Sequence, residues 1–106
     1  MEDRLERTAL VFHLKTDKES IKTLVFQTAA ITTQCTKDDI KIVDCILTFG
    51  GVRTVIADVK TLKMRKNIDS VTLFNRQCIA VNDRDFGIFL QAMKELHIAV
   101  RIFRED

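Results

Sequence analysis

The sequence lacks proline, tryptophan and tyrosine, and it has only three glycines among its 106 residues. Without proline there is no rigid linker and no proline-rich docking segment. No apolar run approaches the roughly 20 residues of a membrane-spanning helix, and the charged N-terminus has no signal-peptide core. We therefore expect a soluble, intracellular protein, cytoplasmic or nuclear, that has no membrane partner.

Cysteine and histidine are scarce and widely spaced. Cys35, Cys45 and Cys78 are odd in number and far apart, which argues against a disulfide framework and against clustered zinc ligands. Their apolar surroundings predict buried core thiols. Nothing local brings His13 and His97 together as an acid–base pair. We expect no catalytic residue, no metal and no cofactor, and hence a protein that is not an enzyme.

Charge is nearly balanced. The chain has 17 basic and 15 acidic residues, a net charge of +2, which does not by itself indicate a polyanion partner. Hydrophobic residues make up 46% of the chain and charged residues 30%, as in a globular protein. The length predicts one domain, residues 1–106. The glycine-rich phosphate-binding motifs G-x-x-x-x-G-K and G-x-G-x-x-G are missing.

The N-terminal third predicts a strand followed by a helix. Residues 8–15 alternate between two faces, as a strand does. Thr16 followed by Glu19 matches a capping box, and apolar residues then recur at helical spacing. Threonines accumulate after position 31 and are poor helix formers, so we expect this helix to end near Cys35.

The C-terminal third predicts three more strands and a second helix. Two short strands, 70–74 and 78–81, would flank a three-residue connection. Asn82 or Asp83 would cap the helix, whose apolar stripe has the spacing i, i+3, i+4 and i+7. That stripe consists of Phe86, Phe89, Leu90 and Met93. Residues 97–103 would form the last strand.

The segment 40–60 is apolar at almost every position. Gly50-Gly51 divides it and favours a two-residue hairpin turn between two strands. The density of β-branched residues favours a strand after the turn. Val55, Val59 and Leu62 would also fit one face of a helix. Because both faces of such a hairpin are apolar, something must cover each of them.

These elements predict an α+β domain of order β-α-β-β-β-β-α-β. Two helices would lie on one face of a largely antiparallel sheet of about six strands, in two layers. The other face would be an apolar patch that contacts a partner. A sheet that curls into a half-barrel and buries both faces is the alternative. We expect the interface to consist of Ile42, Asp44, Ile46, Val55 and Val59.

The predicted function is a non-catalytic protein–protein interaction module, either a homodimer or a subunit of a larger assembly. Asp44 would interrupt the apolar patch, either to protect a sheet edge or as half of an intersubunit ion pair. The alternative is a small nucleic-acid-binding or regulatory protein that uses the basic segment 60–66, interpreted as a loop. Its phosphate contacts would be Lys60, Lys63, Arg65 and Lys66, with Arg53 and Arg76 nearby.

Overall fold

A computed structural model describes residues 5–13, 18–48, 51–76 and 82–104. Within these residues strands and helices alternate along the chain. Their order is β1 (Glu6–His13), α1 (Lys18–Lys37), β2 (Ile40–Thr48), α2 (Val52–Arg65), β3 (Ser70–Leu73), α3 (Asp83–Glu95) and β4 (Ala99–Ile102). The predicted strand 78–81 and the predicted cap Thr16 lie outside the described residues.

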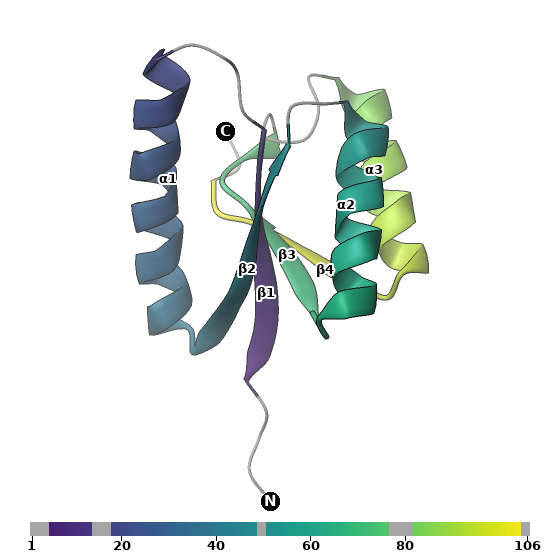
Figure 1. Cartoon of the computed structure of the whole chain (residues 1–106), viewed down its shortest axis with the longest axis horizontal. Helices are drawn as coiled ribbons and strands as arrows, with labels where there is room; N and C mark the ends of the chain where they lie inside the picture. The colour runs from purple at the N-terminus through teal and green to yellow at the C-terminus, as the bar shows by residue number, and fades with distance from the viewer. Residues whose placement is uncertain (1–4, 14–17, 49–50, 77–81, 105–106) are drawn as a thin grey trace, which may run out of the picture.

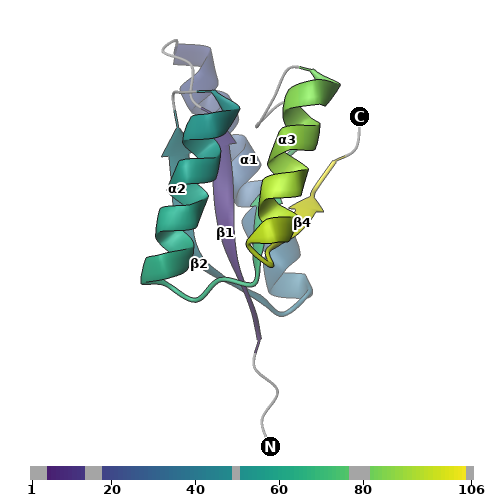
Figure 2. The same cartoon turned by 90° about the vertical axis from the view of Figure 1, so that its right-hand side faces the viewer.

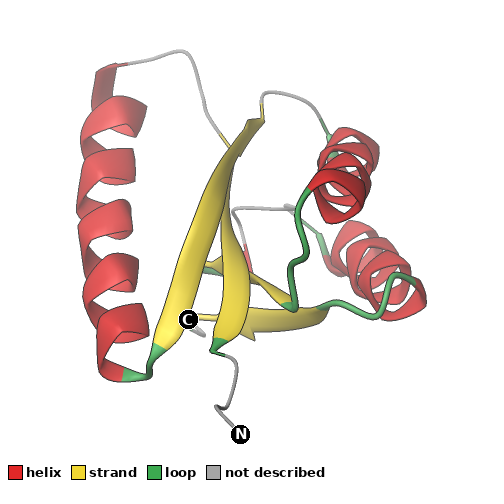
Figure 3. Ribbon diagram, turned by 60° about the horizontal axis from the view of Figure 1, so that its bottom comes forward, coloured by secondary structure: helices red, strands yellow, loops and turns green. Residues whose placement is uncertain are grey.

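The sheet is parallel throughout its described strands, in the order β2-β1-β3-β4. The chain moves outward from β1 to β2 and then crosses β1 to reach β3, so the right-handed crossovers place α1 on one face and α2 and α3 on the other. Figures 1 and 3 show these three layers. The predicted two-layer α+β fold with an antiparallel sheet is therefore wrong, and the architecture is α/β.

The error arose in the segment after Gly50-Gly51. Residues Val52–Arg65 form α2 instead of a strand, and Gly51 is its N-cap residue, while Gly50 lies outside the described residues. Val55, Val59 and Leu62 are the buried residues of α2. Their helical spacing is visible in the sequence, but the prediction gave more weight to the density of β-branched residues, which favours a strand. Since a helix intervenes, β2 has no hairpin partner and pairs with β1 in parallel.

The other helices agree with the sequence. α1 continues two residues past Cys35. The hydroxyls of Thr28, Thr33 and Thr36 each donate to the carbonyl four residues earlier, so they are satisfied within the helix and do not end it. Asn82 caps α3 as predicted: its Oδ1 accepts from the backbone N–H of Asp85 at 2.8 Å.

A Schellman motif ends α3. His97 adopts a positive φ of 59°, its N–H donates to the Lys94 carbonyl, and the next N–H, that of Ile98, donates to the Met93 carbonyl. His97 is thus a capping residue before β4, whereas His13 ends β1 at the opposite, carboxyl edge of the parallel sheet. The two histidines do not meet.

Two apolar clusters hold the layers together. Between the sheet and the helix pair α2–α3 lies the larger one, which contains Val11, Val71, Val55, Phe89 and other residues of these elements. Figure 2 shows the two helices side by side over the sheet. The smaller cluster, under α1, consists of Leu10, Phe12, Ile31, Cys35 and Phe74.

Candidate nucleic-acid interface

Helix α2 concentrates the positive charge of the chain. It carries four basic side chains and one acidic side chain, Asp58, so its net charge of +3 exceeds the +2 of the whole chain. Most of the segment 60–66, which the sequence predicts as a loop, therefore lies in α2. Because α2 is a helix about 21 Å long, its basic side chains are distributed around and along the helix axis. The structure brings only some of the predicted basic residues onto one surface.

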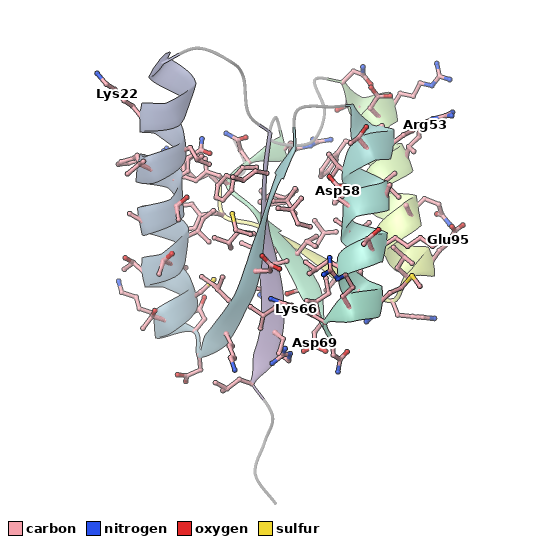
Figure 4. The ribbon with its side chains drawn as sticks, in the orientation of Figure 1. Lys22, Arg53, Asp58, Lys66, Asp69 and Glu95 are labelled. Carbon is pink, nitrogen blue, oxygen red and sulfur yellow. The ribbon has the colours of Figure 1, made fainter. Side chains whose placement is uncertain are left out.

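Arg53 and Lys60 lie on the outer face of α2. Together with Ala57 and Met64 they have the spacing i, i+4, i+7 and i+11, and all four residues are exposed. We call these four residues the α2 stripe. Figure 4 shows Arg53 pointing away from the sheet at the start of α2. The stripe presents two cations directly to solvent, separated by two helical turns.

Lys63 and Lys66 are held by the protein itself. Lys63 Nζ donates to the backbone carbonyl of Ile68 at 2.8 Å. Lys66 Nζ donates to the carbonyl of Val43 at 3.3 Å and lies 3.2 Å from the Asp44 carboxylate. These lysines fix the connection after α2 to its surroundings, so they offer less free charge to a ligand than the α2 stripe does.

Arg76 follows β3, at the carboxyl edge of the sheet. Its guanidinium lies 4.6 Å from the centroid of the Phe86 ring and 3.1 Å from the Asp83 carboxylate. The cation–π contact and the ion pair orient the side chain along the start of α3. Arg76 is about half exposed and belongs to a different element from the α2 stripe.

The N-termini of α2 and α3, both at this edge, differ in charge. The first turn of α3 contains Asp83 and Asp85 and has a side-chain cap, so carboxylates already complement its positive end. The first turn of α2 has no acidic residue, and Gly51 offers no side-chain cap. Arg53 adds its charge to that turn. The start of α2 therefore carries an unbalanced positive charge, whereas the two carboxylates at the start of α3 are partly offset by Arg84 in the same turn.

A groove separates β2 from α2. It has a volume of about 650 Å³ and includes Asp44, Cys45, Asp58, Arg65 and Lys66. Charges of both signs line it, which makes it a poor surface for a polyanion. Cys45 is exposed here, although the sequence predicts a buried core thiol. The pKa of its thiol is raised, first by partial loss of hydration and then by the charge of the Asp44 carboxylate. Cys35 is buried as predicted, and Cys78 lies outside the described residues.

Asp44 lies at a β-bulge in the edge strand β2. The register shifts there, so that Thr8 pairs with Ile42 and Ala9 pairs with Asp44. The backbone N–H of Cys45 donates to the Asp44 carboxylate at 2.7 Å, and this hydrogen bond, followed by that of Lys66, lowers the pKa of Asp44. A bulge that carries a charged pair disfavours edge-to-edge strand pairing. The ion pair of Asp44 is within the chain.

The predicted interface residues do not form one patch. Because the bulge adds a residue, Ile42 packs in the cluster under α1, whereas Ile46 packs on the opposite face. Val55 and Val59 belong to α2 and are fully buried. The hairpin geometry that would have placed these residues together with Asp44 is not formed.

The described residues contain no group of three or more metal-ligating side chains. None of the described helices is long and apolar enough to cross a membrane.

A polar network crosses the α1-facing side of the sheet beside this helix. Arg101 of β4 pairs with Glu6 of β1, and the Ser70 hydroxyl donates to the same carboxylate at 2.7 Å. The hydroxyls of Thr8 and Thr72 lie 2.8 Å apart below it. The hydrogen bond from Arg101 holds the pKa of Glu6 below its ordinary value, although burial opposes this.

We expect the Glu6 contacts to stabilise the fold only above acidic pH. Because the folded-state pKa of Glu6 is lowered, its contribution is complete above the unfolded pKa, near 4.5, and is lost as pH falls through the folded value. Glu6→Gln should therefore lower the free energy of unfolding by about 1 kcal/mol at neutral pH, a value that allows for the partial exposure of the pair. At pH 3 this loss should shrink.

Urea unfolding at the two pH values measures this effect. The matched control is Glu95→Gln at the exposed end of α3, with an expected change below about 0.5 kcal/mol. If Glu6→Gln lowered the free energy of unfolding equally at both pH values, the ionised form of the Glu6 carboxylate would not be the source of the lost stability.

Among solved structures, the fold is similar to the C-terminal catalytic domain of ISC1926 TnpA, an IS607-like serine recombinase. The TM-score is 0.74, and the match covers 94% of this chain and 71% of that chain at 12% sequence identity. At this identity the similarity shows the fold alone. No protein-family model matches the chain, and no curated protein matches it.

Proposed function

We propose that the chain binds the phosphate backbone of double-stranded DNA through the α2 stripe. The observation that carries this proposal is the charge of α2, which is +3 and includes the exposed Arg53 and Lys60 on its outer face. Phosphate contacts by Arg and Lys supply the sequence-independent part of DNA affinity. The fold, which resembles the catalytic domain of a serine recombinase, supports DNA as the nucleic acid.

We propose that the chain binds DNA without cleaving a DNA strand. The similar structure is named a serine recombinase, and this chain has two serines, Ser20 and Ser70. Ser70 is fully buried at the amino end of β3 and donates its hydroxyl to Glu6. It therefore has no access to a bound DNA strand. The side chain of Ser20 lies outside the described residues.

Fluorescence anisotropy with a labelled DNA duplex, measured over a range of salt concentrations, tests the proposal. We expect the affinity to fall as salt rises. The double variant Arg53→Glu with Lys60→Glu should bind roughly ten-fold more weakly at about 0.1 M salt and lower the salt slope by about 2. The proposal fails if the wild-type chain does not bind, or if its affinity ignores salt.

A matched control distinguishes the effect of these two positions from the effect of a change in the net charge of the chain. Lys37→Glu with Lys41→Glu changes the charge equally, at exposed residues near the opposite edge of the sheet. If this control loses as much affinity as the α2 variant, the contact does not lie on the α2 stripe. Incubation with supercoiled plasmid should leave the DNA covalently closed, and nicked product would overturn the non-catalytic part of the proposal.

A further inference from the structure

The sheet face that α1 covers has a groove beside this helix. In Figure 1, α1 is the single labelled helix on its side of the sheet, whereas α2 and α3 both lie on the other side. The groove has a volume of about 270 Å³ and lies between the C-terminal half of α1 and strands β3 and β4. A cavity of about 150 Å³ already accommodates benzene, so this groove has room for a ring with a short chain. Its apolar lining includes Ile31, Ile40, Ile102 and Phe103.

The floor of the groove contains a hydroxyl that can only accept. Thr72 lines the groove and is 5% exposed. Its hydroxyl lies 2.8 Å from that of Thr8, and the Thr8 hydroxyl donates to the Ser70 carbonyl at 3.2 Å. Because a hydroxyl has one hydrogen, Thr72 must be the donor in its contact with Thr8. Its remaining lone pairs therefore offer the groove a hydrogen-bond acceptor.

The rim of the groove, at the C-terminal end of α1, adds two further acceptors. The side-chain amide of Gln34 donates to Asp38 Oδ2 at 3.1 Å, and both residues line the groove and are exposed. The described residues donate no hydrogen bond to Asp38 Oδ1 or to the amide oxygen of Gln34. The free carbonyls at the end of the helix add a partial negative charge. Lys37 lies at the same helix end but does not line the groove.

The charge of Arg101, which also lines the groove, is offset within the protein. Two nitrogens of its guanidinium, Nε and Nη2, donate to the carboxylate of Glu6. An anionic ligand would therefore meet a guanidinium that already holds a carboxylate, together with the negative charge of Asp38. A cationic ligand meets the opposite situation, because Asp38 forms no ion pair with the described residues.

We propose that this groove binds a small primary amine that has an apolar body about the size of one aromatic ring. An ammonium group carries three N–H donors and no acceptor, which matches a lining rich in acceptors. It would donate to Asp38 and Gln34 at the rim, while the ring lies against Ile102 and Phe103. The Phe103 ring is itself stacked on Phe74, with the centroids 5.4 Å apart. This site is on the opposite side of the sheet from α2, so it is independent of the proposed DNA contact.

Titration of the ¹⁵N-labelled chain with 2-phenylethylamine, followed by NMR at about pH 7, tests the site with a protonated amine. A ligand of about nine non-hydrogen atoms should bind with a dissociation constant of about 1 mM, so the titration extends to about 10 mM. We expect saturable shifts of the amides of Cys35, Thr72 and Ile102. The matched acid 3-phenylpropionate has the same ring and chain, and it should bind at least about five-fold more weakly. An amine that causes no saturable shift, or an acid that binds as tightly, would overturn the proposal.

Two neighbouring aspartates provide a matched pair of variants. Asp38→Asn removes the carboxylate at the rim and should weaken amine binding about five-fold. Asp39→Asn removes the same charge at an exposed residue that does not line the groove, so the expected loss is less than about two-fold. Circular dichroism should show both variants folded, and asparagine tolerates the positive φ of 56° at position 39. Equal losses in the two variants, or shifts confined to residues outside the groove, would show that the amine does not bind at this site.

Discussion

Val55→Glu is expected to unfold the protein. Val55 is fully buried in the cluster between the sheet and the helix pair α2–α3. The cluster is built of apolar side chains, so a carboxylate placed there would lose its hydration without gaining a partner, at a cost of several kcal/mol. A domain of this size is stable by only about 5–15 kcal/mol. Far-UV circular dichroism and urea unfolding should show a largely unfolded chain at neutral pH.

Ala57→Glu provides the matched control for this substitution. Ala57 is two residues further along α2, on its exposed outer face, and the same carboxylate there should change the free energy of unfolding by less than about 0.5 kcal/mol. A Val55→Glu protein that stays folded and merely changes its oligomeric state would instead restore the interpretation of Val55 as part of an open apolar patch.

The sequence predicted the elements whose local signals agree with each other. In α3 the cap Asn82 and the stripe of Phe86, Phe89, Leu90 and Met93 both indicate one helix, and the structure has it, although Leu90 is 41% exposed and does not belong to the buried face. In α2 the signals conflict, because valine, isoleucine and threonine favour a strand while the spacing of Val55 and Val59 favours a helix. Tertiary packing decided between them: both valines pack under the helix, on the sheet.

The prediction of a strand where the chain forms helix α2 was enough to give the wrong fold class. A parallel sheet requires a crossover between successive strands, and α2 is the crossover from β2 to β3. Without it, adjacent strands could only be joined as hairpins, which makes the sheet antiparallel. The apolar character of β2 on both faces then has a simple cause. Strands of parallel sheets are covered by helices on both sides and need no alternation.

The candidate interface was predictable in part. Arg53 and Lys60 are visible as cations in the sequence, but their common face appears only when residues 52–65 are helical. The bonds that hold Lys63 and Lys66 join residues up to 23 positions apart and have no local signal. The bulge at Asp44, which sends Ile42 and Ile46 to opposite faces, depends on pairing with β1 and likewise leaves no pattern in the sequence.

Phe89→Ala should produce the second large loss of stability. The Phe89 side chain is fully buried between α3 and the sheet, and its ring lies 6.3 Å from that of Phe86. Truncation removes the transfer free energy of the ring and leaves a cavity, which together cost about 3–5 kcal/mol. Urea unfolding should show a lower midpoint with an unchanged slope, since the surface exposed on unfolding is nearly the same.

Leu90→Ala is the control, because Leu90 is adjacent in sequence but 41% exposed. Leucine and alanine have similar helix propensities, so this substitution mainly reports lost burial, and we expect a cost of about 1 kcal/mol. Adjacent residues of a helix are about 100° apart around its axis. Equal losses at the two positions would therefore mean that α3 is rotated about its axis relative to the sheet, and that a different face of this helix forms the core.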